Sequence, residues 1–160
     1  MGVWDSFFVA QVGASAALAG LVFVGVSINL QKILQLPNLP GRAAQAIVVL
    51  TVVLVQSSLL LIPGESTTVT GLQILVIGAF AWALVIVAER GIWSKTRQEF
   101  RRRYLRQIVF KQLAMGFMVL AGILVLLRGD GAVYWLVPGI LLSYIVALSE
   151  AWVLLIEINR

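Results

Sequence analysis

Hydrophobic residues fill five long runs along the chain, and short polar segments separate them. Charged residues are absent from positions 6–31, 43–64, 66–88, 112–127 and 131–149. Because a bilayer core of ~30 Å needs ~20 apolar residues in a helix, most of these runs are long enough to cross it. The pattern predicts five transmembrane helices, at about residues 7–30, 43–62, 71–88, 108–127 and 133–158.

The connectors between these runs are rich in turn-forming residues: PNLPG at 37–41, PGESTT at 63–68 and RGDG at 128–131. Backbone groups in lipid must pair within their own segment, which makes each run a helix. The longest remaining segment, 90–107, is too short to enclose a core of its own. We therefore expect an all-α polytopic membrane protein, a five-transmembrane-helix bundle in which residues 1–160 form a single integral-membrane helical domain.

Composition agrees with this fold class and excludes several kinds of catalytic and metal site. Hydrophobic residues make up 61% of the chain and charged residues 12%, and the mean hydropathy is +1.00, outside the range of soluble domains. The chain has no cysteine and no histidine, which excludes disulfides, thiolate or histidine metal ligands and Ser-His hydrolysis. Without a glycine-rich phosphate loop or a carboxylate cluster, we expect no enzyme activity and no cofactor or metal site.

Basic residues are distributed unevenly about the five predicted helices. Eleven of the twelve Lys and Arg residues fall on one side of the membrane, and Arg128 alone falls on the other. By the positive-inside rule the richer side is cytoplasmic. The N-terminus is then expected outside and the C-terminus inside.

The basic segment 90–107, RGIWSKTRQEFRRRYLRQ, lies on the predicted cytoplasmic side. Thr96, three residues before Glu99, fits a capping box, which predicts a helix from about Arg97 to Leu127 that projects beyond the bilayer. Clustered cations beside a membrane attract anionic lipid, which we favour over nucleic-acid binding. The predicted surface for anionic lipid or a protein partner comprises Trp93, Phe100, Arg101, Arg102, Arg103 and Tyr104.

The first predicted helix carries a stripe of small or polar residues. On a period of 3.5 the stripe consists of Ser6, Ala10, Gly13, Ala17, Gly20, Val24, Ser27 and Gln31. We favour tight helix packing, within one chain or between copies, because small side chains let membrane helices approach closely. The other interpretation is a ring of stripes around an aqueous path, with Val24 as its apolar constriction. Both predict that protein or water covers the stripe.

Glu150 is an ionisable residue inside the fifth predicted helix, where a buried carboxylate costs ~2.5–3.5 kcal/mol on insertion scales. It shares one helical face with five other residues, and we expect that face to point inward: Gly139, Ser143, Ala147, Leu154 and Glu157. Lys111 of the antiparallel fourth helix is its predicted partner. A structural ion pair, an ion or proton site and a lipid-facing carboxylate are the alternatives.

Three amides complete the predicted polar interior. Gln45 and Gln56 are eleven residues apart, about three turns of the second predicted helix. Asn29 lies off the stripe of the first helix and needs a hydrogen-bond partner if it is below the headgroups.

The segment FFVAQVGASAALAGLVFVGVSINL, residues 7–30, resembles the N-terminal part of a family of small bacterial inner-membrane proteins that often carry the label "modulator of FtsH protease". The resemblance is confined mainly to the first helix. It implies a bacterial inner-membrane location and a partner role, and it carries over no functional residues.

Two functions fit these features. The leading hypothesis is a homo-oligomeric, channel-like protein in which the stripe of the first helix lines a path for small ions. The alternative is a regulator that binds another membrane protein, such as a membrane protease, through its helices or its basic segment.

Overall fold

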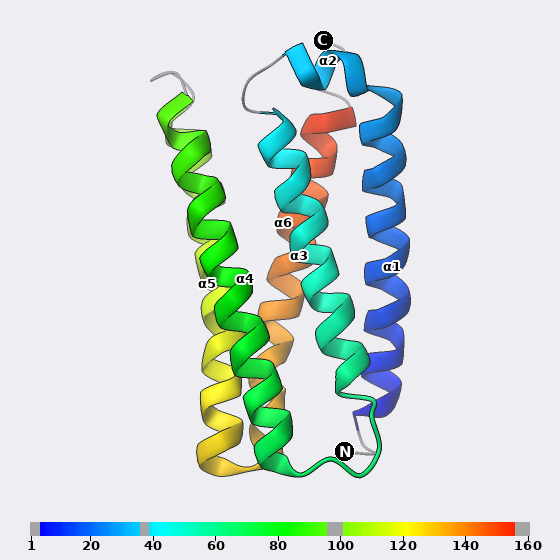
Figure 1. Ribbon diagram of the computed structural model, residues 1–160, viewed down its shortest axis with the longest axis vertical. Coiled ribbons are helices and arrows are strands. Elements are labelled where there is room, and N and C mark those ends of the chain that lie inside the picture. Colours follow the sequence, from blue (N-terminus) through cyan, green and yellow to red (C-terminus); the bar gives the residue numbers. More distant parts are fainter. Residues whose placement is uncertain (1–3, 36–38, 96–100, 156–160) are drawn as a thin grey trace.

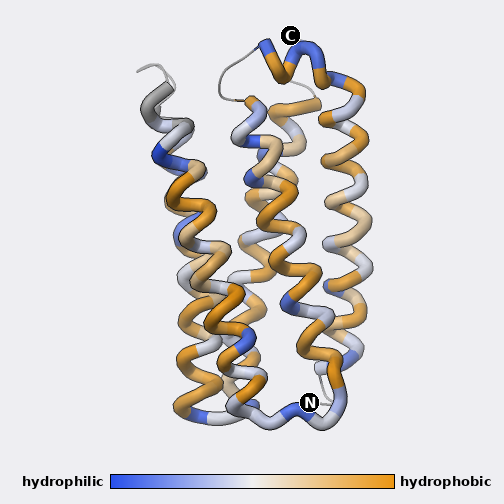
Figure 2. Tube along the Cα trace, in the orientation of Figure 1, coloured by the Kyte–Doolittle hydropathy of each residue, from blue (hydrophilic) through white to orange (hydrophobic). Residues whose placement is uncertain are grey.

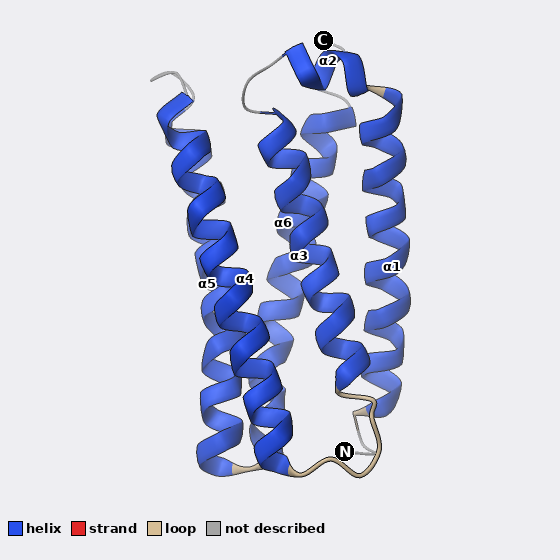
Figure 3. Ribbon diagram, viewed as in Figure 1, coloured by secondary structure: helices blue, strands red, loops and turns tan. Residues whose placement is uncertain are grey.

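The computed structural model describes residues 4–35, 39–95 and 101–155, and within these ranges the chain forms helices and connecting turns without a strand (Figure 3). The elements in chain order are α1 (Asp5–Ile28), α2 (Leu30–Gln35), α3 (Leu39–Leu59), α4 (Thr67–Lys95), α5 (Arg101–Arg128), the 3-10 helix η2 (Asp130–Trp135) and α6 (Leu136–Leu155).

The long helices run side by side along the long axis of the molecule, and α1 starts at the end opposite to the one where α6 finishes (Figure 1). Among the described residues, five segments are long and apolar enough to cross a membrane: Asp5–Ile28, Leu39–Leu59, Thr67–Gly91, Tyr104–Arg128 and Asp130–Leu155. The predicted all-α architecture with five membrane-spanning helices is confirmed at this level.

Helix ends differ from the predicted boundaries where polar residues continue or interrupt a helix. The first helix stops at Ile28 because Asn29 interrupts it, and a short second helix follows. The next long helix, α3, begins at Leu39 rather than near 43, and α4 continues to Lys95 rather than stopping near 88. Both extensions add charged residues to helices, Arg42 and Glu89 among them.

The last two long helices also differ from the prediction in detail. The described part of α5 starts at Arg101, so the predicted capping box at 96–99 lies outside the described residues. A 3-10 turn occupies 130–135, and Pro138 sits in the first turn of α6, a position that tolerates proline. The predicted end of the fifth helix, 156–158, also lies outside the described residues.

The core lies between α3, α4, α5 and α6. Met115, Met118, Leu136 and Ile140 are among its fully buried side chains. Apolar residues extend along all the long helices, whereas hydrophilic residues concentrate at both ends and at a few inner positions (Figure 2). By contrast, α1 packs on the outside of the bundle, against α3 and α6.

Helices α4 and α5 pack antiparallel and approach each other closely. A Cβ atom added at Gly122 of α5 would lie 2.6 Å from the backbone nitrogen of Leu75 in α4. One added at Gly71 of α4 would lie 2.8 Å from Cγ of Leu126 in α5. The two helices therefore approach at positions that lack a side chain, the usual arrangement for tight packing in membranes.

Candidate functional site

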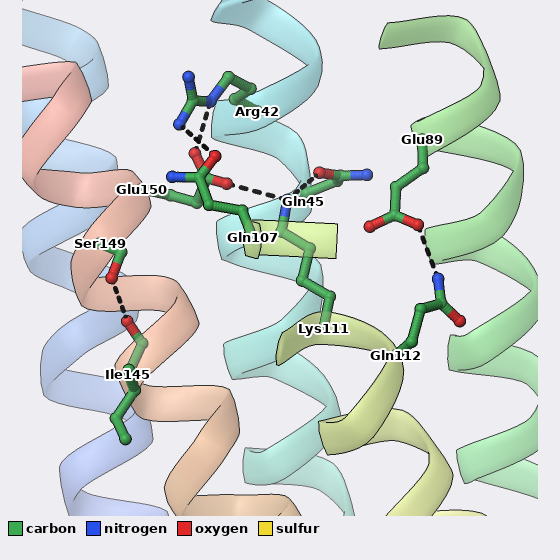
Figure 4. Close-up of polar contacts among 9 residues, drawn as sticks. All are labelled: Arg42, Gln45, Glu89, Gln107, Lys111, Gln112, Ile145, Ser149 and Glu150. Carbon is green, nitrogen blue, oxygen red and sulfur yellow. Dashed lines mark hydrogen bonds and ion pairs between the residues drawn. The ribbon is translucent and has the colours of Figure 1, made fainter. Parts of the chain in front are cut away.

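Three charged side chains from three helices meet near the end of the bundle where α3 and α5 begin and α6 finishes (Figure 4). Nε of Arg42 lies 2.6 Å from Oε2 of Glu150, and Nζ of Lys111 lies 2.9 Å from Oε1 of the same carboxylate. The side chains of Lys111 and Glu150 are each 1% exposed, and that of Arg42 is 17% exposed. The predicted Glu150–Lys111 pair is confirmed, and a lipid-facing Glu150 is wrong, because the carboxylate is enclosed by its two partners.

Two amides hold the cations of this cluster in place. Nζ of Lys111 donates a hydrogen bond of 2.7 Å to Oε1 of Gln45, and Nη2 of Arg42 donates one of 3.1 Å to Oε1 of Gln107. Arg42 and Gln45 are three residues apart on α3, and Gln107 and Lys111 are four apart on α5, spacings that put each pair on one helix face. We call Arg42, Gln45, Gln107, Lys111 and Glu150 the ion cluster.

A second polar group links α4 to α5 beside the ion cluster (Figure 4). Nε2 of Gln112 donates a 2.6 Å hydrogen bond to Oε2 of Glu89, and Nε1 of Trp82 donates to Oε1 of Gln112. Glu89 is 6% exposed. Glu89 is therefore bonded to an amide on α5 rather than to one of the cations of the ion cluster.

The other predicted polar residues lie apart from the ion cluster. Gln56 is buried, but its amide atoms have no hydrogen-bond partner among the described residues. Asn29 is buried where α1 ends and donates hydrogen bonds to the carbonyl oxygens of Leu154 at 3.3 Å and Gly25 at 3.4 Å. The structure therefore brings together Glu150, Lys111 and Gln45 and leaves Gln56 and Asn29 elsewhere.

The predicted inward face of the fifth helix is confirmed over the described residues. All five of its described members are buried: Gly139, Ser143, Ala147, Glu150 and Leu154. The sixth, Glu157, lies outside the described residues. This face turns Glu150 toward α3 and α5, where its partners are.

The predicted basic and aromatic surface is corrected at Tyr104. Its side chain is 4% exposed, and its ring lies 5.9 Å from Nζ of Lys111 and 6.2 Å from the Trp93 ring, centroid to centroid. Tyr104 therefore packs inside the bundle, because it lies on the same face of α5 as Lys111. Arg101, Arg102 and Arg103 lie in the first turn of α5, and Phe100 lies outside the described residues.

The small-residue stripe of α1 faces away from the bundle. All eight predicted members are exposed, but only seven of them lie on α1: Ser6, Ala10, Gly13, Ala17, Gly20, Val24 and Ser27. Gln31 lies on α2, beyond the interruption at Asn29. The buried residues of α1 are Phe8, Ser15, Val22 and Gly25, which at ~100° per residue lie on the opposite side of the helix. A Cβ atom added at Gly13 or Gly20 would meet nothing within 4 Å. Packing of the stripe within one chain is therefore wrong, and packing between chains stays a prediction.

Sequence reasoning missed five members of the polar groups: Arg42, Trp82, Glu89, Gln107 and Gln112. Arg42 and Glu89 lay just outside the predicted spans, because hydropathy ends a span at the first charge. One signal in the sequence could have found Arg42 and Gln107. Each lies three or four residues from a predicted member, Gln45 or Lys111, and residues at that spacing share a helix face.

Comparisons of this chain with protein-family models, curated proteins and solved structures gave no match. The resemblance of residues 7–30 to the inner-membrane family stays a prediction from those residues.

Proposed function

We propose that this protein is a non-enzymatic membrane protein that self-associates through the outward face of α1, and that a ring of these faces encloses a path for small ions. The observation that carries the proposal is the exposure of the whole small-residue stripe on the side of α1 opposite the bundle. Glycine and alanine allow a second helix to approach closely, and that packing drives association where lipid provides no hydrophobic force. If only acyl chains covered it, such a stripe would make fewer packing contacts than it makes against a second helix.

The interior of a single bundle offers a poorer ion path than the stripe. Glu150 is already paired with two cations, and Met115 and Met118 fill the core beside it. An ion crossing there would have to displace these pairs. A path between copies of α1 would have Ser6 at one mouth, Ser27 at the other and Val24 as an apolar constriction.

Orientation and location belong to the same proposal. The end of the bundle that holds α2 and the start of α5 would be cytoplasmic, because nine of the ten Lys and Arg residues in the described part of the chain lie at that end. The N-terminus would be outside, and the membrane would be a bacterial inner membrane, as the resemblance of residues 7–30 implies.

The alternative function is a regulator that offers the same face of α1 to a helix of another membrane protein, such as a membrane protease. The open face and the resemblance of residues 7–30 both favour it. The two functions differ in what covers α1, a second copy or a different chain.

Cysteine cross-linking tests self-association directly, because the chain contains no cysteine of its own. Ala17→Cys places one thiol midway along the stripe, and Val76→Cys, at a residue of α4 that is 56% exposed, is the matched control. We expect copper-catalysed oxidation in native membranes to give a disulfide-linked dimer from Ala17→Cys and monomer from Val76→Cys. Equal yields would argue against a specific α1 interface.

Ion flux into liposomes tests the path. Purified protein should pass K⁺ or Na⁺, and Gly20→Leu should reduce that flux severalfold because leucine fills the face, whereas Val76→Leu on α4 should leave it unchanged. Silent liposomes containing cross-linkable oligomer would contradict the path and leave self-association standing. If Ala17→Cys instead cross-links to a different protein, the regulator is the better proposal.

A further inference from the structure

A groove runs between α5 and α6 at the end of the bundle that holds the ion cluster. Its volume is about 610 Å³, and its walls include Arg106, Gln107 and Phe110 of α5 and Leu148, Ser149 and Trp152 of α6. Glu150 of the ion cluster also borders it. This volume is within the range of small-molecule sites, so the groove has room for part of a lipid.

The polarity of the groove changes along its length. Arg106 and Gln107 lie near the start of α5, and Trp152 lies near the finish of α6, all toward the same end of the bundle. Phe110 lies about one turn deeper than Arg106, and Ile145 lies about two turns deeper than Trp152. Polar groups with an aromatic ring at headgroup depth and apolar groups below them match the order of parts in a phospholipid.

Cationic charge exceeds anionic charge around this groove. Arg106 is exposed and makes no ion pair with any described residue. At this end of the bundle the described acidic residues are Glu89 and Glu150. Both are buried, Glu89 with a hydrogen bond to Gln112 and Glu150 in its ion pairs. The described basic residues there are Lys32, Arg42, Arg90, Lys95, Arg101, Arg102, Arg103, Arg106 and Lys111. The end is therefore attractive to anions of the membrane surface.

We propose that the groove between α5 and α6 binds one anionic phospholipid, with its phosphate on Arg106 and Gln107, its headgroup region beside Trp152 and an acyl chain against Phe110, Ile145 and Leu148. The occupant is a lipid rather than a second copy of this chain in the same orientation. To pair with Arg106, such a copy would need an exposed carboxylate at the same depth in the membrane.

The remaining described carboxylates do not meet that need. Asp5, Glu65 and Asp130 lie at the opposite end of the bundle. A phosphate headgroup supplies the anion without a protein partner.

The bound lipid is also connected to the ion cluster. Oε1 of Gln107 accepts a hydrogen bond from Arg42, which pairs with Glu150 on the other helix of the groove. Lipid contacts that hold Gln107 and α6 together therefore favour the same arrangement of α5 and α6 as the ion pairs. Because a ligand that binds the folded state raises its stability, lipid binding is measurable as thermal stabilisation.

The test titrates the delipidated, detergent-solubilised full chain with phosphatidylglycerol and, separately, with phosphatidylcholine of the same acyl chains, following Tm and bound lipid by native mass spectrometry. Phosphatidylglycerol should bind more tightly than phosphatidylcholine. Arg106→Gln should weaken its binding about fivefold, the equivalent of ~1 kcal/mol for one basic residue near a membrane surface. Arg90→Gln, which removes an exposed charge of α4 at the same end, is the matched control and should change binding less than twofold.

A second variant separates the groove from diffuse charge attraction. Leu148→Trp enlarges an exposed side chain of the groove wall, keeps every charge and should also displace phosphatidylglycerol. Equal losses in Arg106→Gln and Arg90→Gln, or equal affinity for the two lipids, would overturn the proposal. Stabilisation by inorganic phosphate alone at the same concentration would show a phosphate site without a lipid, and a change in particle mass with Leu148→Trp would show an interface between copies; either result also overturns it.

Discussion

Glu150 illustrates how a membrane-embedded charge is tolerated at the level of single residues. Two cations from different helices reach its carboxylate at 2.6 and 2.9 Å, and each cation donates one further hydrogen bond to a glutamine side chain. Desolvating these charges is costly, so the intact cluster adds little net stability to the fold. Removing one partner is strongly destabilising, because the other charge then stays buried and unpaired. The ion cluster therefore fixes how α3, α5 and α6 meet.

Neutralising members of the ion cluster should destabilise the fold in a definite order. Glu150→Gln leaves Lys111 and Arg42 facing each other and should lower stability most, by about 3–5 kcal/mol. Lys111→Met should cost less, because Arg42 still pairs with Glu150. Arg42→Gln should cost least, since that side chain is 17% exposed and its charge reaches water. Thermal unfolding of the detergent-solubilised variants measures this order.

The control for that series is Arg90→Gln, which removes an exposed charge from α4 and should leave Tm unchanged. A Glu150→Gln protein as stable as the wild type would show that the ion pairs contribute nothing to folding.

The sequence predicts three of the five members of the ion cluster, Gln45, Lys111 and Glu150, and the charged pair among them for a physical reason. Lys111 and Glu150 lie inside the runs predicted to span the membrane, 108–127 and 133–158, where a charge must find a partner, so their pairing follows from the cost of burial. Arg42 lies at the edge of such a run, where a cation can equally extend to the headgroups. Its inward direction depends on the start of α3 at Leu39, which hydropathy does not specify.

At the level of helices, hydropathy predicts which segments cross the membrane better than it predicts which faces meet. The glycine and alanine stripe of α1 is as apolar as lipid requires, so composition cannot distinguish a face that packs inside from one that points outward. The outward direction follows from packing: Phe8, Val22 and Gly25 occupy the side against α3 and α6. The close α4–α5 approach likewise depends on tertiary packing at Gly71 and Gly122.

Glycine substitutions on α5 test this helix packing. Gly122→Ala places a methyl group 2.6 Å from the backbone of Leu75, which has no flexible end to move away, so we expect a loss of about 1–3 kcal/mol from overpacking. Gly116→Ala on the same helix meets nothing within 4 Å and should be neutral or stabilising by about 0.5–1 kcal/mol. Tm values in detergent compare the two. Equal effects would mean that helix propensity, rather than the α4–α5 contact, sets the cost.

At the scale of the whole molecule, the two ends of the bundle differ in charge and in the sites they carry. The end with α2 and the start of α5 holds the ion cluster and the lipid groove, and the other end holds Arg128 as its single basic residue among those described. The positive-inside rule assigns orientation from this difference in basic residues between the two ends. Both the proposed orientation and the proposed lipid therefore depend on one distribution of charge.

Cysteine labelling in intact cells measures the orientation. Thr68→Cys, exposed at the start of α4, and Gln35→Cys, exposed on α2, lie at opposite ends of the bundle. With the N-terminus outside, a membrane-impermeant maleimide should label Thr68→Cys in spheroplasts and Gln35→Cys only after the membrane is opened. The reverse pattern would contradict the proposed orientation. It would also put Arg106 and its groove in the outer leaflet, away from the anionic cytoplasmic surface to which the basic end is otherwise attracted.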